Sequence, residues 1–340
     1  MDADLKAVIK EINKKHGQDT VILGSDVTQR MPRFPTGSLG LDAILGGGWP
    51  GNTWSELVGE SSHGKTAVAF KTLAANQDAN PDFTAVWVAA EEFVPEYAEM
   101  CGVDLSRLVL VETNIMEHAF DSVLKFASSR TVDGIILDSL PALVPLPEDE
   151  ADMDKASVGR GALVTNKFFR KIGSSMKRSL TEADRPIFGL VINQYRMKIG
   201  VMHGDPRTTV GGEGKNYSYF SRVEVKRDGW IEVGKGDQKR KVGQSIRLRT
   251  TKNKTAPSQQ TAFVDFYFGP GGDCLPGDYD FGRELVNLAH HYDILDRSGS
   301  WFSFAGQKWQ GAEAVADAIR QDIDLREAMD KEVRDVLSRL

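Results

Sequence analysis

The octapeptide GESSHGKT at residues 59–66 contains the residue types that bind a polyphosphate. It has the P-loop (Walker A) pattern of a glycine, four further residues and then Gly-Lys-Thr. Glycines allow successive N–H groups to wrap phosphates at the start of a helix whose dipole also attracts anions. Lys65 is expected to reach the β- and γ-phosphates, and the Thr66 hydroxyl to coordinate Mg²⁺. The predicted nucleotide-binding residues here are Gly59, Glu60, Ser61, Ser62, His63, Gly64, Lys65 and Thr66.

Carboxylates that follow two apolar runs could complete this site. Asp138 ends the run GIILD, where it can hold the coordination shell of Mg²⁺ together with Thr66. Hydrolysis also needs a group that polarises water, and Glu91 in the segment AAEE is the candidate, with Glu92 as its alternative. An acidic pair at a strand end is also common on ordinary surfaces. Together these residues predict an ATPase that uses ATP and Mg²⁺.

A long polar connection follows another apolar run. Residues 192–212, INQYRMKIGVMHGDPRTTVGG, begin as a buried strand and then lose any regular pattern. Connections this long are usually functional or disordered. Residues 195–254 contain 15 Lys and Arg against 6 Asp and Glu, a net charge of +9, whereas the whole chain carries −6. Such a basic block is an electrostatic footprint for phosphates, although a solvated basic face has the same composition.

The middle of the chain supplies the elements that must position these residues. The segment TWSELVG predicts a strand before the P-loop, and TAVWVAA, LVLVE, GIILDS and IFGLVIN predict fully buried strands. Helical spacing is found in residues 65–76 and in the segments PEYAEMC, AFDSVLKFASS and LVTNKFFRKIGSSMKRSL. This alternation predicts an α/β fold, with a mostly parallel sheet flanked by helices on both sides.

The two ends of the chain have other patterns. Residues 4–16 predict a short amphipathic helix. The segments YFSRVEVKRDGWIEVG, SIRLRTTKN and TAFVDFYFG predict an antiparallel extension of the sheet. After GPGGDCLPGD, a helix, a hairpin around WFSFAGQKW and a helical tail over residues 311–340 predict a small α/β module. The expected division is therefore 1–32 for the helix and linker, 33–269 for the core and 270–340 for the module.

Composition narrows the class of protein. A chain of 340 residues that is 41% hydrophobic can bury a sizeable core. It has no apolar run long enough for a membrane span and no secretory leader pattern, so we expect a cytoplasmic protein without a membrane partner. Cys101 and Cys274 lack metal-type spacing and are expected to be reduced bystanders.

Five segments in this order resemble the bacterial RecA recombinase family, in a divergent or bacteriophage-encoded form. They are FPTGSLGLDAILGGG, GESSHGKT, VDGIILDSLPALVP, the connection at residues 192–212 and KNK at residues 252–254. The connection is the most specific of them, because many ATPases share a P-loop. The resemblance covers nearly the whole chain and implies a RecA-like P-loop ATPase core with an N-terminal helix and a small C-terminal α/β module.

The resemblance also assigns roles at the nucleotide. It implies that Gln194 contacts the γ-phosphate and relays its presence to the next loop, and that Tyr97 stacks on adenine. Lys252 and Lys254 are implied to reach the ATP of a neighbouring subunit, with the electrostatic logic of an arginine finger. The catalytic set is thus Glu91, Lys65, Gln194, Lys252 and Lys254, with Thr66 and Asp138 for the metal.

Two loops, at residues 147–160 and 196–209, are implied to line a helical filament and bind single-stranded DNA. Cations and backbone amides there suit phosphates, and small apolar side chains can wedge between bases. An isolated apolar residue would otherwise be expected in the core. The expected DNA-binding residues are Val158, Arg160, Arg170, Arg196, Lys198, Ile199, Thr208, Gly211 and Gly212.

The chain departs from the family pattern at several positions. His203 stands where the family has a Phe linked to communication between subunits, so cooperativity is expected to differ. Leu163 stands where the family has a basic residue, and Arg160 is expected to compensate for the loss of that charge. Val94 stands where the family has an Asp that recognises adenine. The sequence ends at Leu340 without an acidic tail, which is expected to ease access of duplex DNA.

The sequence therefore predicts an ATP-dependent homologous recombination protein. It would form helical filaments on single-stranded DNA, pair with homologous double-stranded DNA and exchange strands, with DNA-stimulated ATP hydrolysis. Two alternatives remain. One is a RecA-like ring ATPase or motor without strand exchange, which the connection at 192–212 disfavours. The other is a regulatory module that has lost turnover, which the intact P-loop and carboxylates disfavour.

Overall fold

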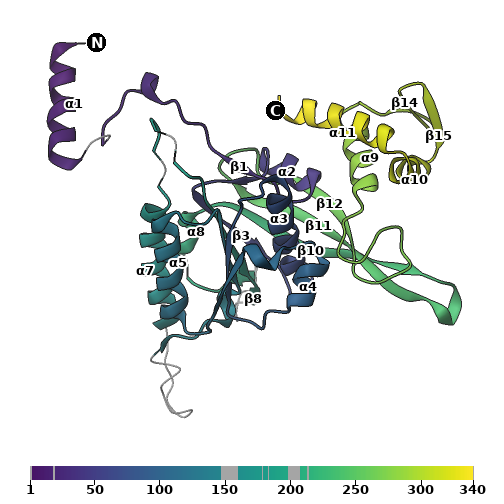
Figure 1. Ribbon diagram of the computed structural model, residues 1–340, viewed down its shortest axis with the longest axis horizontal. Coiled ribbons are helices and arrows are strands. Elements are labelled where there is room, and N and C mark those ends of the chain that lie inside the picture. Colours follow the sequence, from purple (N-terminus) through teal and green to yellow (C-terminus); the bar gives the residue numbers. More distant parts are fainter. Residues whose placement is uncertain are drawn as a thin grey trace.

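A computed structural model of the chain describes residues 2–17, 20–146, 160–177, 179–182, 184–197, 207–212 and 214–339. Its centre is an eight-stranded sheet in the order β12-β11-β10-β3-β7-β6-β4-β5 (Figure 1). The strands from β10 to β5 in this order run parallel, and β11 and β12 extend the sheet antiparallel. This confirms the predicted mostly parallel sheet. The strands are β3 Thr53–Val58, β4 Ala85–Ala89, β5 Leu108–Glu112, β6 Gly134–Asp138, β7 Phe188–Asn193, β10 Tyr219–Val233, β11 Arg240–Asn253 and β12 Thr261–Tyr267.

The four inner strands β3, β4, β6 and β7 are buried at every position, because helices cover both faces of the sheet. One hydrophobic core joins the sheet to α3, and a second joins it to α5 and α7. The helices of this region are α2 Leu39–Leu45, α3 Lys65–Ala79, α4 Pro95–Met100, α5 Met116–Ser129, α7 Arg160–Ser175 and α8 Gly214–Ser218. The helix predicted to run to residue 180 ends earlier, at Ser175.

The strand β5 is less buried than its sequence predicts. Its sequence LVLVE predicts full burial, yet it is the edge strand of the sheet and none of its positions is fully buried: Leu108 and Val111 are partly buried and the other three are exposed. Val109 and Leu110 are 39% and 40% exposed. An apolar run alone does not distinguish a central strand from an edge strand whose outer side has no neighbour, and the prediction of full burial was wrong.

Register brings the carboxyl ends of the parallel strands to one edge of the sheet. Ala89 pairs with Asp138 across β4 and β6, and Val58 pairs with Asn193 across β3 and β7. The P-loop follows Val58, and Gln194 follows Asn193. Open α/β sheets bind their ligands outside this edge.

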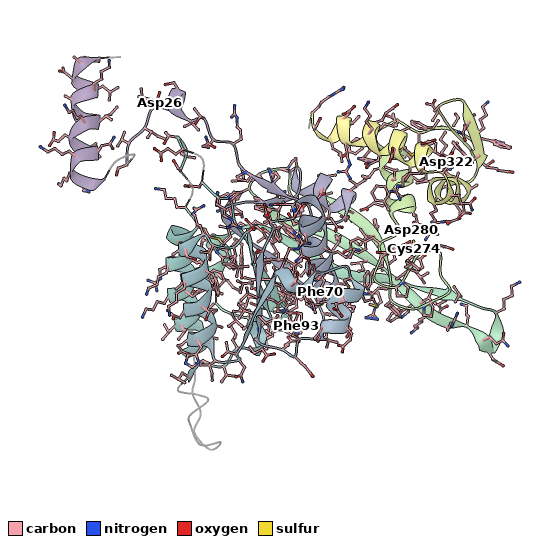
Figure 2. The ribbon with its side chains drawn as sticks, viewed as in Figure 1. Asp26, Phe70, Phe93, Cys274, Asp280 and Asp322 are labelled. Carbon is pink, nitrogen blue, oxygen red and sulfur yellow. The ribbon has the colours of Figure 1, made fainter. Side chains whose placement is uncertain are left out.

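The C-terminal part forms a separate core around α9, beside the end of the sheet (Figure 1). It contains α9 Phe281–His291, β13 Asp296–Ser298, β14 Trp301–Phe304, β15 Gln307–Gln310, α10 Ala312–Gln321 and α11 Ile323–Leu337. The predicted helix and hairpin are confirmed. The single predicted tail helix is two helices, because the Asp322 side chain, labelled in Figure 2, accepts hydrogen bonds from the N–H groups of Asp324 and Leu325 and starts a new one.

The amino-terminal helix α1, Ala3–His16, confirms the predicted helix but buries none of its residues. It stands apart from the sheet in Figure 1. Short segments connect the larger elements: η1 Gly24–Asp26, β1 Arg33–Phe34, β2 Trp49–Pro50, η2 Leu105–Arg107, η3 Leu140–Ala142, β8 Tyr195–Met197, β9 Arg207–Thr209 and η4 Gly236–Gln238. Within the described residues, no helix is both long and apolar enough to span a membrane. The domain limits at residues 32 and 269 stay predictions.

Candidate functional site

The P-loop connects the carboxyl end of β3 to the first turn of α3, as the sequence predicts. Gly64 caps the helix with a φ of 96°, in the region that favours glycine. A side chain at Gly59 would place its Cβ 2.1 Å from the carbonyl oxygen of Val225 on β10. Both glycines are therefore required where they stand, and the loop is packed closely against the neighbouring strand.

The Lys65 side chain is already held within the loop. It is 6% exposed, and its Nζ donates to the Glu60 carbonyl at 2.6 Å. Burial lowers the pKa of Lys65, while Asp138, Glu91 and Glu60 act in the opposite direction. A buried ammonium in a loop of backbone N–H groups is suited to an anionic ligand.

Thr66, in the first turn of α3, lies beside Asp138, at the end of β6. The Thr66 hydroxyl donates to Asp138 Oδ2 at 3.1 Å. Burial and the nearby Glu91 carboxylate raise the pKa of Asp138 to about 7. A hydroxyl and a buried carboxylate are oxygen ligands of the kind that Mg²⁺ prefers. The described residues hold no cluster of three or more His, Cys, Asp or Glu that could bind a metal alone. Mg²⁺ is often held by one or two protein oxygens together with the phosphates of a nucleotide, and the Thr66 hydroxyl and Asp138 carboxylate fit such an ion.

The structure favours Glu91 over Glu92 as the acidic residue of the site. The Glu91 N–H donates to the Asp138 carbonyl at 3.2 Å, and the Ser139 hydroxyl donates to the Glu91 carboxylate. These contacts hold Glu91 beside the strand end that carries Asp138. The carboxylate is exposed, so water can reach it.

Tyr97 lies on α4 and packs against the core. Its ring packs edge-on against that of Phe70, with the ring centroids 5.6 Å apart. The centroids of the Phe70 and Phe93 rings, two residues labelled in Figure 2, are 5.9 Å apart. Burial raises the pKa of Tyr97 above its ordinary value. These contacts fit the helix-face packing expected of a Tyr, and stacking on adenine stays a prediction.

Gln194 begins the long connection and is tied to its far end. The Asn193 side chain accepts from the Gln194 N–H at 2.8 Å and donates to the Val210 carbonyl at 3.2 Å. Two short strands, β8 and β9, then pair antiparallel, with Arg196 opposite Thr208. The connection thus starts and ends beside the same residue, which sequence reasoning did not single out.

The predicted DNA-binding residues are only partly described. Gly211 and Gly212 have φ of 102° and 74° and end the connection against α7. Arg196 is exposed on β8, and Arg170 is exposed on α7 with its Nε 3.4 Å from the Asn166 carbonyl. Leu163, the departure from the family pattern on α7, is 69% exposed. Val158, Lys198, Ile199 and His203 lie outside the described residues, as does the side chain of Arg160.

Lys252 and Lys254 lie away from the P-loop of their own chain. Lys252 is opposite Arg222 on β10, while the P-loop follows Val58, which pairs with Glu224. The two ammonium groups instead donate to carbonyls of α8, Lys252 to Asn216 and Lys254 to Tyr217.

A buried acidic residue on β3 was missed. Glu56 is fully buried, pairs with Arg222 and accepts from Asn193 Nδ2 at 2.7 Å. Its signal in the sequence is a carboxylate inside the strand TWSELV, where an unpaired charge would be costly. Glu56 links β3, β7 and β10 behind the P-loop.

Comparisons with known proteins agree with this geometry. A family model described as "RecA N-terminal domain" matches residues 3–273, and one described as "RecA C-terminal domain" matches residues 283–338. Proteins named "Protein RecA" are similar over 98% of this chain. That of Lactobacillus delbrueckii subsp. bulgaricus is 34% identical, with 96% of its own length covered. That of Staphylococcus aureus is 34% identical with 92% covered, and that of Lactococcus lactis subsp. cremoris 33% with 83% covered.

Proposed function

This chain belongs to the RecA family, whose members are ATP-dependent recombinases, and we propose that it hydrolyses ATP in response to DNA. It polymerises on single-stranded DNA and exchanges strands with a homologous duplex. The observation that carries the proposal is the hydrogen bond between Thr66 and Asp138. It joins the P-loop to the carboxylate of a separate strand at the edge where parallel sheets bind ligands.

The residues of the site divide the work of hydrolysis. Amides of the P-loop and the Lys65 ammonium hold the phosphates and neutralise the charge that develops on them. Thr66 and Asp138 would hold Mg²⁺, which would offset the negative charge of the phosphates. Glu91 orients the attacking water, and Gln194 senses the γ-phosphate.

Lys252 and Lys254 act on the ATP of the neighbouring protomer. The register supports this role, because the P-loop lies at least three residues along the sheet from Lys252, roughly 10 Å at the rise of a strand. Both lysines donate hydrogen bonds to carbonyls of α8, which lies away from the P-loop of the same chain. Turnover therefore depends on assembly.

The chain assembles into the helical filament of the family, and α1 forms part of the contact between neighbouring copies. Leu5 and Val8 are 48% and 51% exposed on a helix that buries none of its residues. A helix of this length has little stability alone in water, so a neighbouring copy provides the surface against which it packs.

DNA is bound by the connection after β7 and by the segment before α7. Asn193 links the Gln194 N–H to the Val210 carbonyl, so the start and the end of the connection are joined through one side chain. The described residues that we assign to DNA contacts are Arg170, Arg196, Thr208, Gly211 and Gly212. Strand pairing, and not side-chain readout, tests homology.

The test is ATP hydrolysis with no DNA, with single-stranded DNA and with duplex, over a range of protein concentrations. We expect single-stranded DNA to stimulate the hydrolysis rate, and this stimulation to rise cooperatively with the protein concentration. A strand-exchange assay is the next step. A rate indifferent to DNA would favour the ring or motor ATPase, which electron microscopy on DNA distinguishes from a filament.

A further inference from the structure

Arg227 on β10 connects the P-loop to the long β10–β11 hairpin. Its Nη2 donates to the Ser62 carbonyl at 3.0 Å, and its Nε donates to Gln244 Oε1 at 3.2 Å. Gln244 is 6% exposed on β11 and lies beside the P-loop, since a Cβ at Gly64 would come 3.1 Å from its Nε2. Arg227 is therefore fixed by a buried partner that contacts the same loop.

An aromatic ring completes the support of the guanidinium. The Cζ of Arg227 lies 4.0 Å from the centroid of the Trp230 ring, and Lys241 Nζ lies 4.2 Å from it. Contacts of a cation with an indole ring at this distance are favourable. Trp230 is directly opposite Gln244 in the register of the hairpin, so the indole ring and the amide both fix the position of the Arg227 guanidinium.

The Ser62 carbonyl is a sensitive place to hold the loop. Ser62 has a φ of 60°, in the left-handed region that costs a non-glycine residue free energy unless its surroundings compensate. In a trans peptide the carbonyl and the following N–H point in opposite directions. A donor that fixes the Ser62 carbonyl consequently fixes the direction of the His63 N–H, one of the amides of the P-loop.

From these contacts we infer that Arg227 is a positioning residue that sets the His63 amide for a nucleotide phosphate, held in place by Trp230 and Gln244. The inference rests on the proposed function, because it needs the P-loop to bind ATP. Arg227 touches no reacting atom in this role. It preorganises the loop, and preorganisation lowers the free-energy cost of binding.

The experiment measures binding of the N-methylanthraniloyl derivative of ATP, with Mg²⁺ and without DNA, to the full chain. Arg227→Gln should raise the Kd about five- to tenfold, and Arg227→Lys should raise it less because one donor can still reach Ser62. Lys226→Gln is the matched control: it removes a charge from the preceding residue, which is exposed, and should leave the Kd unchanged. KM in DNA-stimulated hydrolysis should rise with the Kd while kcat at saturating ATP stays near that of the native protein.

Two further results decide the inference. Trp230→Leu should weaken binding in the same direction, because it removes the ring beneath Arg227, and it tests the idea should Arg227→Gln fold poorly. Equal nucleotide affinity in the native protein and the Arg227 variants, or an equal loss in Lys226→Gln, would overturn the positioning role. Failure of the native protein to bind the nucleotide would instead overturn the proposed function, and this inference with it.

Discussion

The Thr66 hydroxyl and the Asp138 carboxylate, 72 residues apart in sequence, form a hydrogen bond of 3.1 Å. The fold itself thus brings these two residues of the site together. Lys65 is equally prepared, since it is buried and bonded to the Glu60 carbonyl. Preorganised charges of this kind stabilise a transition state without reorganising during the reaction.

Lys65→Ala should abolish DNA-stimulated ATP hydrolysis, because it removes the only cation that the P-loop itself carries. The loss is expected to reach about a hundredfold or more in kcat. Lys71→Ala is the matched control on the same helix: Lys71 pairs with Asp278 at 3.3 Å and lies away from the loop. Normal turnover in the Lys65 variant would reject the assignment of the P-loop.

Lys252→Ala and Lys254→Ala should leave nucleotide binding by the isolated chain intact and reduce hydrolysis on DNA. Mixing Lys252→Ala with Lys65→Ala protomers gives a sharper test. Some interfaces in a mixed filament combine an intact P-loop with an intact lysine pair from the neighbour, so activity should partly return. If the mixture stays as inactive as its components, the lysines act within one subunit.

Local patterns predicted the strands and helices of this site, but not the contacts between them. GESSHGKT and GIILD correctly predicted the ends of β3 and β6, because a P-loop and a terminal carboxylate are signals in one stretch of chain. The exposure of β5 depends on which strand lies at the edge, and the partners of Glu56 come from two other strands. No local periodicity contains that information.

Replacing Leu5 and Val8 together by Ser should prevent filament assembly without lowering the thermal stability of the free chain. Both side chains are already exposed, so the free chain loses little buried area. Light scattering with single-stranded DNA and ATP measures assembly. Lys14→Ser is the control, because its position lies on the opposite face of α1. Assembly that persists in the double variant would mean that α1 is not an interface.

Arg196→Ala should weaken binding to single-stranded DNA equally for all sequences. Removing one phosphate contact should also reduce the slope of log affinity against log salt by about one. Lys125→Ala removes an exposed cation of α5 that pairs with Asp121, and should change neither quantity. An unchanged salt slope in the Arg196 variant would place the phosphate contacts elsewhere.

Glu284 on α9 should make stability fall as pH rises. It is buried against α2, accepts from the Ser38 hydroxyl and the Gly40 N–H, and its Oε2 has no hydrogen-bond partner. Burial raises its pKa from 4.5 to about 7. Between these two values the folded chain binds more protons than the unfolded chain, so the free energy of unfolding decreases as the carboxyl ionises. Asp42 nearby, with its pKa raised to about 6, acts in the same direction.

Glu284→Gln isolates this contribution, because its amide oxygen can still accept from Ser38 and Gly40 while its NH₂ replaces the unpartnered oxygen. Denaturant unfolding should show that the free energy of unfolding falls less between pH 5 and pH 8 in the variant than in the native chain. The part of this pH dependence that comes from Asp42 should remain. Glu313→Gln, at a side chain that is 53% exposed, serves as the control and should behave like the native chain. A difference between native and Glu284→Gln that stays the same at both pH values would show that Glu284 does not titrate in this range.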